Sequence, residues 1–373
     1  PASSLRDQRD QLLSRLSELF SITVREQPSG AVNVYIGNEA LVQFATSAGL
    51  KTVNETGPDG LPAVGVRFKI NNGTVKSNAG QVQGFINARD SHVKTQLSRL
   101  DGLVTSLIGE VNRLHAGGRG LSGFSDLTGL TVIQDVAASL SSVLGDQATV
   151  PTTGSFFIDV QDMTTGQSVR HQINVDLDGI GSDTTLTSLV ADINANVPGV
   201  TATVLSDGRL KLASSAGTEF SFADDTSGSL ASLGLNTFFS GTDSTNFAVN
   251  SLVANNPNIL AASQTIFAGD GSNAGAIAAM KDRVITSLGG VSFNDYFASS
   301  VAEMAVSSAG AQSAMDASSI VFDSLSVQRE SVSGVNLDEE AVSMLSYQRA
   351  YQGAAKFMQV IDDMLQVLLG ILR

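Results

Sequence analysis

The chain has no cysteine and no tryptophan, and its 373 residues include only four tyrosines and seven prolines. The absence of cysteine excludes disulfides, thiolate zinc sites, iron–sulfur clusters and cysteine nucleophiles. The shortage of aromatic side chains disfavours a glycan-binding groove, which is usually lined by such rings. Charged residues are also scarce, at 16% against a usual value of about 25%.

Positive charge is in particularly short supply. The 22 basic residues face 36 acidic ones, so the net charge is −14. Binding to nucleic acid or to an anionic membrane surface depends on Lys and Arg, so this balance disfavours both kinds of partner. The longest apolar run, near Val367–Leu372, is far shorter than the roughly 20 residues of a membrane span.

Catalytic and metal-binding patterns are missing as well. The histidines His92, His115 and His171 lie in three different segments, with no second ligand three or four residues away. We interpret His92 and His115 as solvated positions on a helix and at its end. The glycine-rich stretch Gly269–Asn273 has neither the Lys-Ser/Thr of a P-loop nor the acidic spacing of a calcium loop, which favours a plain loop. We therefore predict no enzymatic activity, no metal and no cofactor.

Apolar residues make up 42% of the chain, enough for real cores, and its length suggests two or three domains. Stretches with a helical period alternate with stretches of period two, which predicts an α+β multidomain protein. We expect an elongated helical bundle or coiled-coil stalk with two small β-rich domains inserted. The predicted parts are helical stalk segments at 1–29 and 79–116, a small β unit at 30–78, a linker at 117–153, an outer β-rich domain with one helix at 154–241, a loop-rich return at 242–273, a further stalk helix at 274–332, and a C-terminal heptad helix at 336–373.

The last predicted helix has the most regular pattern. Nine apolar positions step by alternating intervals of three and four residues, which is the 3.5-residue period of a coiled-coil seam. They are Met344, Tyr347, Tyr351, Ala354, Met358, Ile361, Leu365, Leu368 and Leu372. At these positions the two tyrosines are better explained by packing than by base stacking.

The start of that helix carries capping signals. After a break at Ser333 and Gly334, an N-cap at Asn336 with Glu339 three residues later resembles a capping box. Asp338 and Glu340, next to Leu337, also suit a first helical turn because acidic side chains favour the positive end of the helix dipole. This explains the acidic run better than a catalytic acid pair does.

Burying the nine seam side chains would contribute on the order of 10–20 kcal/mol, whereas helix propensity alone barely sustains such a helix. We therefore expect the C-terminus to be loosely ordered in the monomer and to fold against another helix. That helix could belong to a segment preceding Pro1, to a neighbouring subunit, or to both. The alternative is a helix docked on its own domain.

The stretch from Ser331 to Glu340, followed by Tyr347-Gln-Arg-Ala-Tyr-Gln352 and the heptad tail, resembles the C-terminus of flagellar rod, hook and hook-associated proteins. Other stretches are similar to the hook-associated members that lie at the hook–filament junction: Leu5–Leu13, Val32–Gly37, Gly84–Asp90 and Ser292–Tyr296. Residues 155–213 are similar to the small β-rich insert of flagellins and hook-associated proteins.

This resemblance implies a structural protein of the bacterial flagellum, involved in motility and exported by the type III apparatus to the cell exterior. It implies self-assembly into a ring-like layer that contacts the hook protein and the second junction protein. It also implies an export chaperone on the apolar stripe from Tyr347 to Leu372. Such proteins begin with a helix that pairs with the C-terminal one, and since nothing here corresponds to it, we expect an N-terminal truncation. Alternative interpretations are another axial subunit (flagellin or the second junction protein) and, from a different class, a secreted adhesin or glycan-binding protein.

Overall fold

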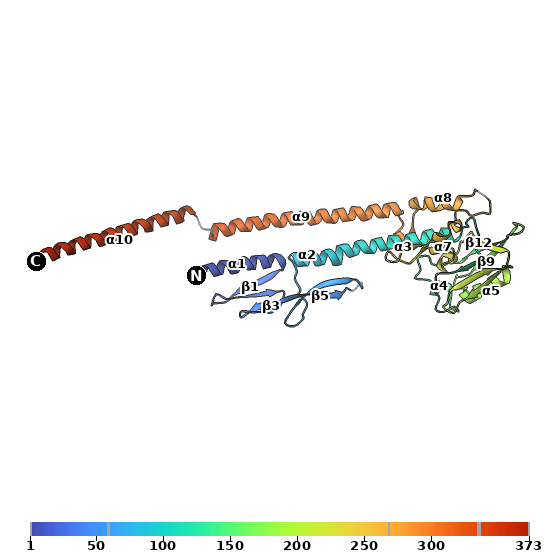
Figure 1. Cartoon of the computed structure of the whole chain (residues 1–373), viewed down its shortest axis with the longest axis horizontal. Coiled ribbons are helices and arrows are strands. Elements are labelled where there is room, and N and C mark those ends of the chain that lie inside the picture. The colour runs from blue at the N-terminus through green and yellow to red at the C-terminus, as the bar shows by residue number, and fades with distance from the viewer. Residues whose placement is uncertain (1, 58–59, 268, 334–336, 372–373) are drawn as a thin grey trace. The chain divides into compact units, whose positions relative to one another are not determined.

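The computed structural model describes residues 2–57, 60–267, 269–333 and 337–371. Long helices and small antiparallel sheets occupy separate parts of the chain (Figure 1), which confirms the α+β prediction. The chain divides into two compact units, Pro1–Ser300 and Val301–Arg373. The boundary between them falls inside one helix, α9 (Phe293–Ser333).

Helix α1 (Ala2–Leu19) leads into a small β unit, residues 20–78. This unit contains an antiparallel sheet of order β1-β2-β3-β4 and a separate hairpin, β5–β6. Its core forms around Phe20, Ile36, Leu41 and Phe68. The strands are β1 (Ile22–Glu26), β2 (Val32–Ile36), β3 (Glu39–Gln43), β4 (Thr46–Ser47), β5 (Leu50–Thr56) and β6 (Pro62–Phe68).

The first strand corrects the sequence prediction, which assigns residues 1–29 to a helical stalk segment. The helix ends at Leu19, and Ile22–Glu26 pairs with β2 instead. The physical reason is the β-branched run Ile22-Thr23-Val24, which loses side-chain freedom in a helix and packs well in a strand. A Gly37–Asn38 turn joins β2 to β3, with Gly37 at a φ of 58°.

A second long helical segment follows, as the periodicity between residues 81 and 115 predicts. It consists of α2 (Gln81–Asn87), a π-helical stretch (Ala88–Val93) and α3 (Lys94–Ala116). No residue of the first two pieces is buried, and in α3 the buried residues begin at Ser106. The C-terminal end of α3 is therefore the part that enters a protein core.

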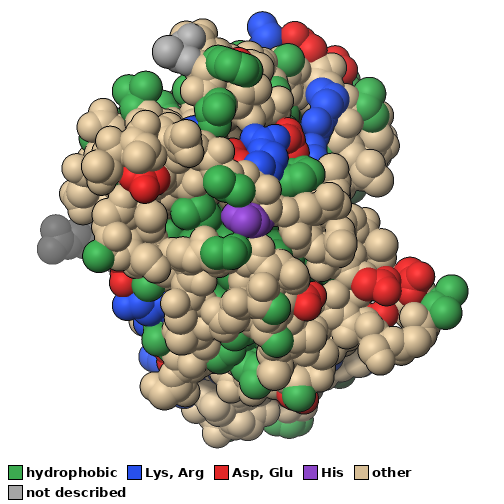
Figure 2. Space-filling view, turned by 90° about the vertical axis from the view of Figure 1, so that its right-hand side faces the viewer, with side chains coloured by type: hydrophobic (Ala, Val, Ile, Leu, Met, Phe, Trp, Pro, Cys, Tyr) green, Lys and Arg blue, Asp and Glu red, His purple; other side chains and the backbone are tan. Residues whose placement is uncertain are grey.

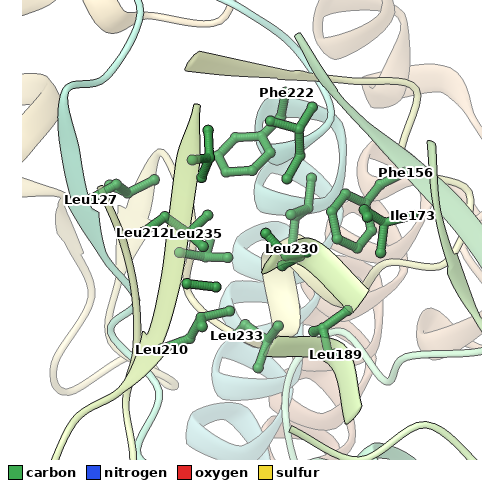
Figure 3. Close-up of a cluster of buried hydrophobic side chains, with 14 of the residues drawn as sticks. Leu127, Phe156, Ile173, Leu189, Leu210, Leu212, Phe222, Leu230, Leu233 and Leu235 are labelled. Atoms are coloured by element: carbon green, nitrogen blue, oxygen red, sulfur yellow. The ribbon is translucent and has the colours of Figure 1, made fainter. Parts of the chain in front are cut away.

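That core belongs to the large β domain, which we define as residues 117–241. Two antiparallel sheets of order β12-β8-β9 and β10-β11-β7 enclose it, and helix α5 packs beside β9 and β10. Figure 3 shows leucines and phenylalanines from both sheets, among them Leu212, Phe156 and Phe222, pointing at one another. The elements are β7 (Asp126–Thr128), α4 (Leu140–Val143), β8 (Gly154–Asp162), β9 (Ser168–Val175), α5 (Leu186–Asn196), β10 (Val200–Val204), β11 (Leu210–Ser214), β12 (Thr218–Ala223), α6 (Ser229–Ser232) and β13 (Phe239–Ser240).

Residues 117–153 differ from the predicted linker. They place Leu127, Ile133, Leu140 and Leu144 in the same buried cluster as the strands that follow. The apolar pieces in this Gly/Ser-rich stretch are too short to show a period, but each supplies one or two side chains to the core. The domain therefore begins directly after α3.

The chain then returns through short elements: β14 (Ala248–Val249), α7 (Ser251–Asn255), α8 (Ser272–Ala279) and the 3-10 turns Pro257–Ile259, Met280–Asp282 and Thr286–Leu288. Met280, Ile285 and Leu288 pack against Val111 of α3. The stalk helix predicted from residue 274 starts only at Phe293. Gly289 and Gly290, with φ values of 77° and 81°, interrupt the helix before that point.

Candidate functional site: the exposed C-terminal helix

Helix α10 (Leu337–Ile371) carries the predicted seam. Its first turn holds Asp338, Glu339 and Glu340, as expected from the favourable position of carboxylates at a helix N-terminus. Ser333 is the last residue of α9 and Leu337 the first of α10. The predicted cap residues Gly334 and Asn336, and the last seam residue Leu372, lie outside the described residues.

The eight seam residues that the structure describes are all exposed in the single chain. The exposed fraction runs from 37% at Ile361 to 78% at Tyr351. A side chain of the size of Leu or Met contributes about 1.5–3 kcal/mol when it is fully buried. The chain therefore leaves most of the free energy available from this seam unused.

A second apolar stripe runs along the C-terminal half of α10. Phe357, Val360, Met364 and Val367 are spaced by three, four and three residues, and each is more than half exposed. Each precedes a seam residue by one position, so at about 100° per residue the two stripes lie side by side. Sequence reasoning missed this stripe, although the same three-and-four spacing was its signal.

The two stripes together cover roughly half of the helix circumference. A two-stranded coiled coil needs only the narrower seam. Gln359, Asp362, Asp363 and Gln366 are exposed on the remaining side. The C-terminal half of α10 is therefore suited to pack between two neighbouring helices and to keep one polar side toward water.

Helix α9 also carries apolar residues over its exposed part. Seven of its apolar residues are spaced by three, four or seven positions, and the described side chains beyond residue 301 are exposed almost throughout. These positions are Phe297, Val301, Met304, Ala311, Met315, Phe322 and Leu325. Ala and Ser fill much of the rest of the helix, with further exposed apolar side chains outside these positions at Val306, Ile320, Val321 and Val327.

A buried polar junction lies where α3 ends. The last carbonyl groups of a helix have no partner inside the helix, and here two asparagines from distant segments supply it. The Asn236 amide nitrogen donates to the carbonyl oxygens of His115 (3.1 Å), Ala116 (3.3 Å) and Gly118 (2.9 Å). The Asn273 amide nitrogen donates to the carbonyl oxygen of Leu114 at 3.1 Å.

His115 completes this junction and corrects the prediction of a solvated side chain. It is fully buried, and Ala261 N donates to its Nε2 at 3.0 Å. The proton is therefore assigned to Nδ1, which donates to the Asn236 carbonyl oxygen at 2.7 Å. Burial lowers the pKa of His115, so the neutral ring is the folded form. Its neighbours lie more than 100 residues away in sequence, which is why local pattern did not reveal them.

The loop Gly269–Asn273 belongs to the same region. The Asp270 carboxylate accepts hydrogen bonds from Ser263 Oγ (2.7 Å), Thr265 Oγ1 (2.9 Å) and Thr265 N (3.0 Å). These bonds hold the pKa of Asp270 well below its usual range. The loop positions Asn273 for its bonds to Leu114 and to the Ala261 carbonyl oxygen (2.7 Å).

Among the residues that the structure describes, no group of three or more His, Asp or Glu side chains is placed to hold a metal ion. Within the same residues, no helix combines the length and the apolarity needed to cross a lipid bilayer. The exposed apolar surface of α10 is thus the candidate functional site with the strongest physical basis.

Comparison with known proteins addresses the same parts of the chain. Residues 1–129 match the family model of the flagellar hook-associated protein FlgK helical domain, and residues 328–371 match that of the flagellar basal body rod FlgEFG protein C-terminal region. The second match covers all of α10.

Two curated relatives align over almost the whole chain. Flagellar hook-associated protein 1 of Escherichia coli (strain K12) is 25% identical over 388 residues, covering 99% of this chain and 64% of the relative. The protein of the same name from Salmonella typhimurium is 25% identical over 380 residues, covering 99% and 65%. The chain thus spans slightly less than two-thirds of the length of these relatives. The solved structure of the flagellar hook junction protein FlgK from Burkholderia pseudomallei aligns with 70% of this chain and 45% of its own, at 16% identity and a TM-score of 0.33.

Proposed function

Since this chain is a FlgK-type flagellar hook-associated protein by sequence, we propose that it is a structural subunit that joins the hook to the filament. In this proposal it carries out no chemical reaction. It assembles with further copies into a ring-like layer outside the cell, in contact with the hook protein and the second junction protein. In this proposal the long helices make the contacts between subunits, and the two β-rich parts of the chain face outward.

One observation supports this proposal above the others, namely that α10 exposes two adjacent apolar stripes in the single chain. Isolated helices are marginal in water even when their propensity is good. A helix with this much exposed apolar surface is stabilised chiefly by contact with other helices, and a polymer of subunits supplies such contacts. The same surface would bind an export chaperone before assembly.

Hydrogen exchange on the full chain, free and mixed with filament-less hooks, tests this proposal. We expect fast amide exchange across α10 in the free protein and slow exchange in the large β domain, whose core is buried. Addition of hooks should slow exchange in α10 and leave the large β domain unchanged. Slow exchange of α10 in dilute protein alone, or no change on adding hooks, would refute assembly through this helix.

The adhesin alternative makes a different prediction for the same sample. It requires a glycan to protect residues of the large β domain, with α10 unaffected. A glycan array that gives no signal, together with protection of α10 by hooks, would exclude it.

A further inference from the structure

The second long helical segment contains a stretch with π-helical geometry, Ala88–Val93, between α2 and α3. Its hydrogen-bond ring is longer than in an α-helix, since the Lys94 N–H donates to the carbonyl oxygen of Arg89, five residues earlier. Such a stretch holds one residue more than the α-helical turn it replaces, and π-helical turns inside α-helices are frequent at functional sites. The stretch contains neither Gly nor Pro, so its own residues do not disfavour an α-helix. Its geometry is therefore a matter of contacts with the rest of the chain.

The extra residue decides which apolar side chain lies in line with α3. Val93, Leu97 and Leu100 follow one another at steps of four and three residues, and each is about half exposed. In a regular α-helix, Ile86 would continue this stripe, because seven residues at about 100° each make close to two full turns. The π-helical stretch takes up one residue, so Phe85, eight residues before Val93, continues the stripe instead. In agreement, Phe85 is 75% exposed whereas Ile86 is half-buried.

The hairpin β5–β6 contacts the helix within this stretch. Arg89 Nη1 donates to the carbonyl oxygen of Val64 at 2.8 Å, and the Asp90 carboxylate accepts two further bonds from the same guanidinium, at 2.6 and 3.0 Å. A hollow of about 450 Å³ lies beside this contact, between hairpin residues such as Leu61 and helix residues such as Leu97. The hairpin thus holds the stretch through Arg89, with room beside it for the helix to rearrange.

The small β unit and α2 form one body on the N-terminal side of the stretch. Ser21 N donates to the Ala79 carbonyl oxygen at 3.1 Å, so the chain leaves α1 and returns to α2 at one place. Gly80 has a φ of 96°, and a Cβ there would lie 2.6 Å from the carbonyl oxygen of Leu19. Val82 of α2 packs against the core of the unit. A turn of α2 about the helix axis would therefore carry the small β unit with it.

We propose that residues 88–93 act as a register switch, with the bond from Arg89 to Val64 as its latch. In the latched form the stretch is π-helical and Phe85 lies in line with the stripe of α3. When the latch opens, the stretch relaxes to an α-helix, so α2 and the small β unit turn by about 100° relative to α3 and Ile86 takes the place of Phe85. Both forms present a large apolar side chain at that position, which explains why two such residues follow each other. The switch is a property of the single chain and goes beyond the proposed function.

The turn changes how the small β unit faces the large β domain around the helix axis. Figure 2 shows the end of the molecule that the large β domain forms, where charged side chains occur in several separate places. A turn of the small β unit therefore places it beside a differently charged part of this domain. Two copies in different states of the switch would present different surfaces to the same neighbour.

Spin labels measure the turn directly, because the chain has no cysteine of its own. One label is attached to the small β unit through Thr52→Cys and the other to α3 through Ser98→Cys, both at exposed positions. Pulsed electron paramagnetic resonance on the full chain gives the distribution of distances between them. An element packed roughly 10 Å from an axis moves by about 15 Å when it turns by about 100°. An opened switch should therefore add a second distance, several ångströms from the first.

Three variants of the labelled chain test the mechanism. Arg89→Ala should produce the second distance by removing the latch, whereas the matched control Arg99→Ala, which removes the same charge ten residues farther along the helix, should not. Deletion of Ser91 removes the extra residue, so the stretch becomes α-helical in the latched phase, and adding Arg89→Ala should then leave the distance unchanged.

Four results would overturn the switch. They are a single distance in Arg89→Ala, the same second distance in Arg99→Ala, a second distance in the Arg89→Ala variant that also lacks Ser91, and a shifted or undefined distance on deletion of Ser91 alone. The last result would mean that the latched form needs every residue of the stretch, contrary to the assignment of one extra residue.

Discussion

The seam of α10 makes the most direct prediction. Replacing Ile361, Leu365 and Leu368 together by Ser should abolish attachment to hooks without unfolding the rest of the chain. The three side chains are 37%, 51% and 53% exposed in the single chain. Their burial in an assembly would therefore remove from water roughly the equivalent of one and a half fully exposed side chains. At about 1.5–3 kcal/mol each, the triple variant loses about 2–4 kcal/mol per subunit.

This free energy corresponds to a weakening of attachment by roughly 30- to 1,000-fold, since about 1.4 kcal/mol is a factor of ten. The assay is sedimentation of labelled protein with filament-less hooks across a range of concentrations. The matched control replaces Gln359, Asp363 and Gln366 by Ser, on the polar side of the same helical turns. Both variants introduce three serines, so they share much of the loss of helix propensity.

Circular dichroism of the free proteins should show similar helix content for the two variants. Attachment of the seam variant within a factor of three of the wild type would refute the argument that this seam is an assembly surface. Equal loss in both variants would instead mean that helix stability, not the apolar stripe, controls attachment.

Other features of the structure lead to further predictions. Replacing Phe357 and Met364 of the second stripe by Ser should weaken hook attachment about as much per residue as changes in the seam. If α10 packed against one helix through the seam alone, the same two substitutions would leave attachment unchanged. Asn236→Ala should lower the free energy of unfolding by about 3 kcal/mol in urea titrations, because the carbonyl groups of Ala116 and Gly118 lose the side-chain donor and that of His115 loses one of its donors. Gly118→Ala should cost about 1–3 kcal/mol in the same assay, since its Cβ would overlap the Asn273 amide nitrogen. The pKa of His115 is lowered in the folded state, so its contribution is complete above the unfolded value of 6.5 and is lost as pH falls below it. The stability advantage of the wild type over His115→Gln should therefore shrink between about pH 7.5 and 5.5, and a constant difference in thermal midpoints would contradict a neutral buried ring.

Periodicity was sufficient to predict the long helices. The one helix predicted within residues 154–241 is α5, whose Leu186, Leu189 and Ile193 recur at helical spacing and are all buried. Asp207–Gly208, a residue pair typical of hairpin turns, lies between β10 and β11. In these cases the residues that determine the element are also the residues that pack it, so a short window of sequence contains the information.

The segments that differed from prediction are those whose structure depends on distant partners. Leu127 and Leu140 belong to short apolar stretches with no helical or strand period of their own. They are buried because they pack into the core of the large β domain. His115 looked solvated because it ends an amphipathic helix beside two glycines, yet Asn236 and Ala261 enclose it. The turn at Phe44 and Ala45, which joins β3 to β4 with both residues at positive φ, was missed because residues with a Cβ are disfavoured in that conformation.

The junction at the end of α3 has a mechanical consequence. Asn236 follows α6 and Asn273 lies in α8, and the side-chain amides of both residues donate to carbonyl groups of the last turn of α3. A force applied along α3 acts on all of these hydrogen bonds at once, so they must break together and not one after another. Bending of α3 would thus be transmitted to the large β domain through these hydrogen bonds, which make the connection stiff.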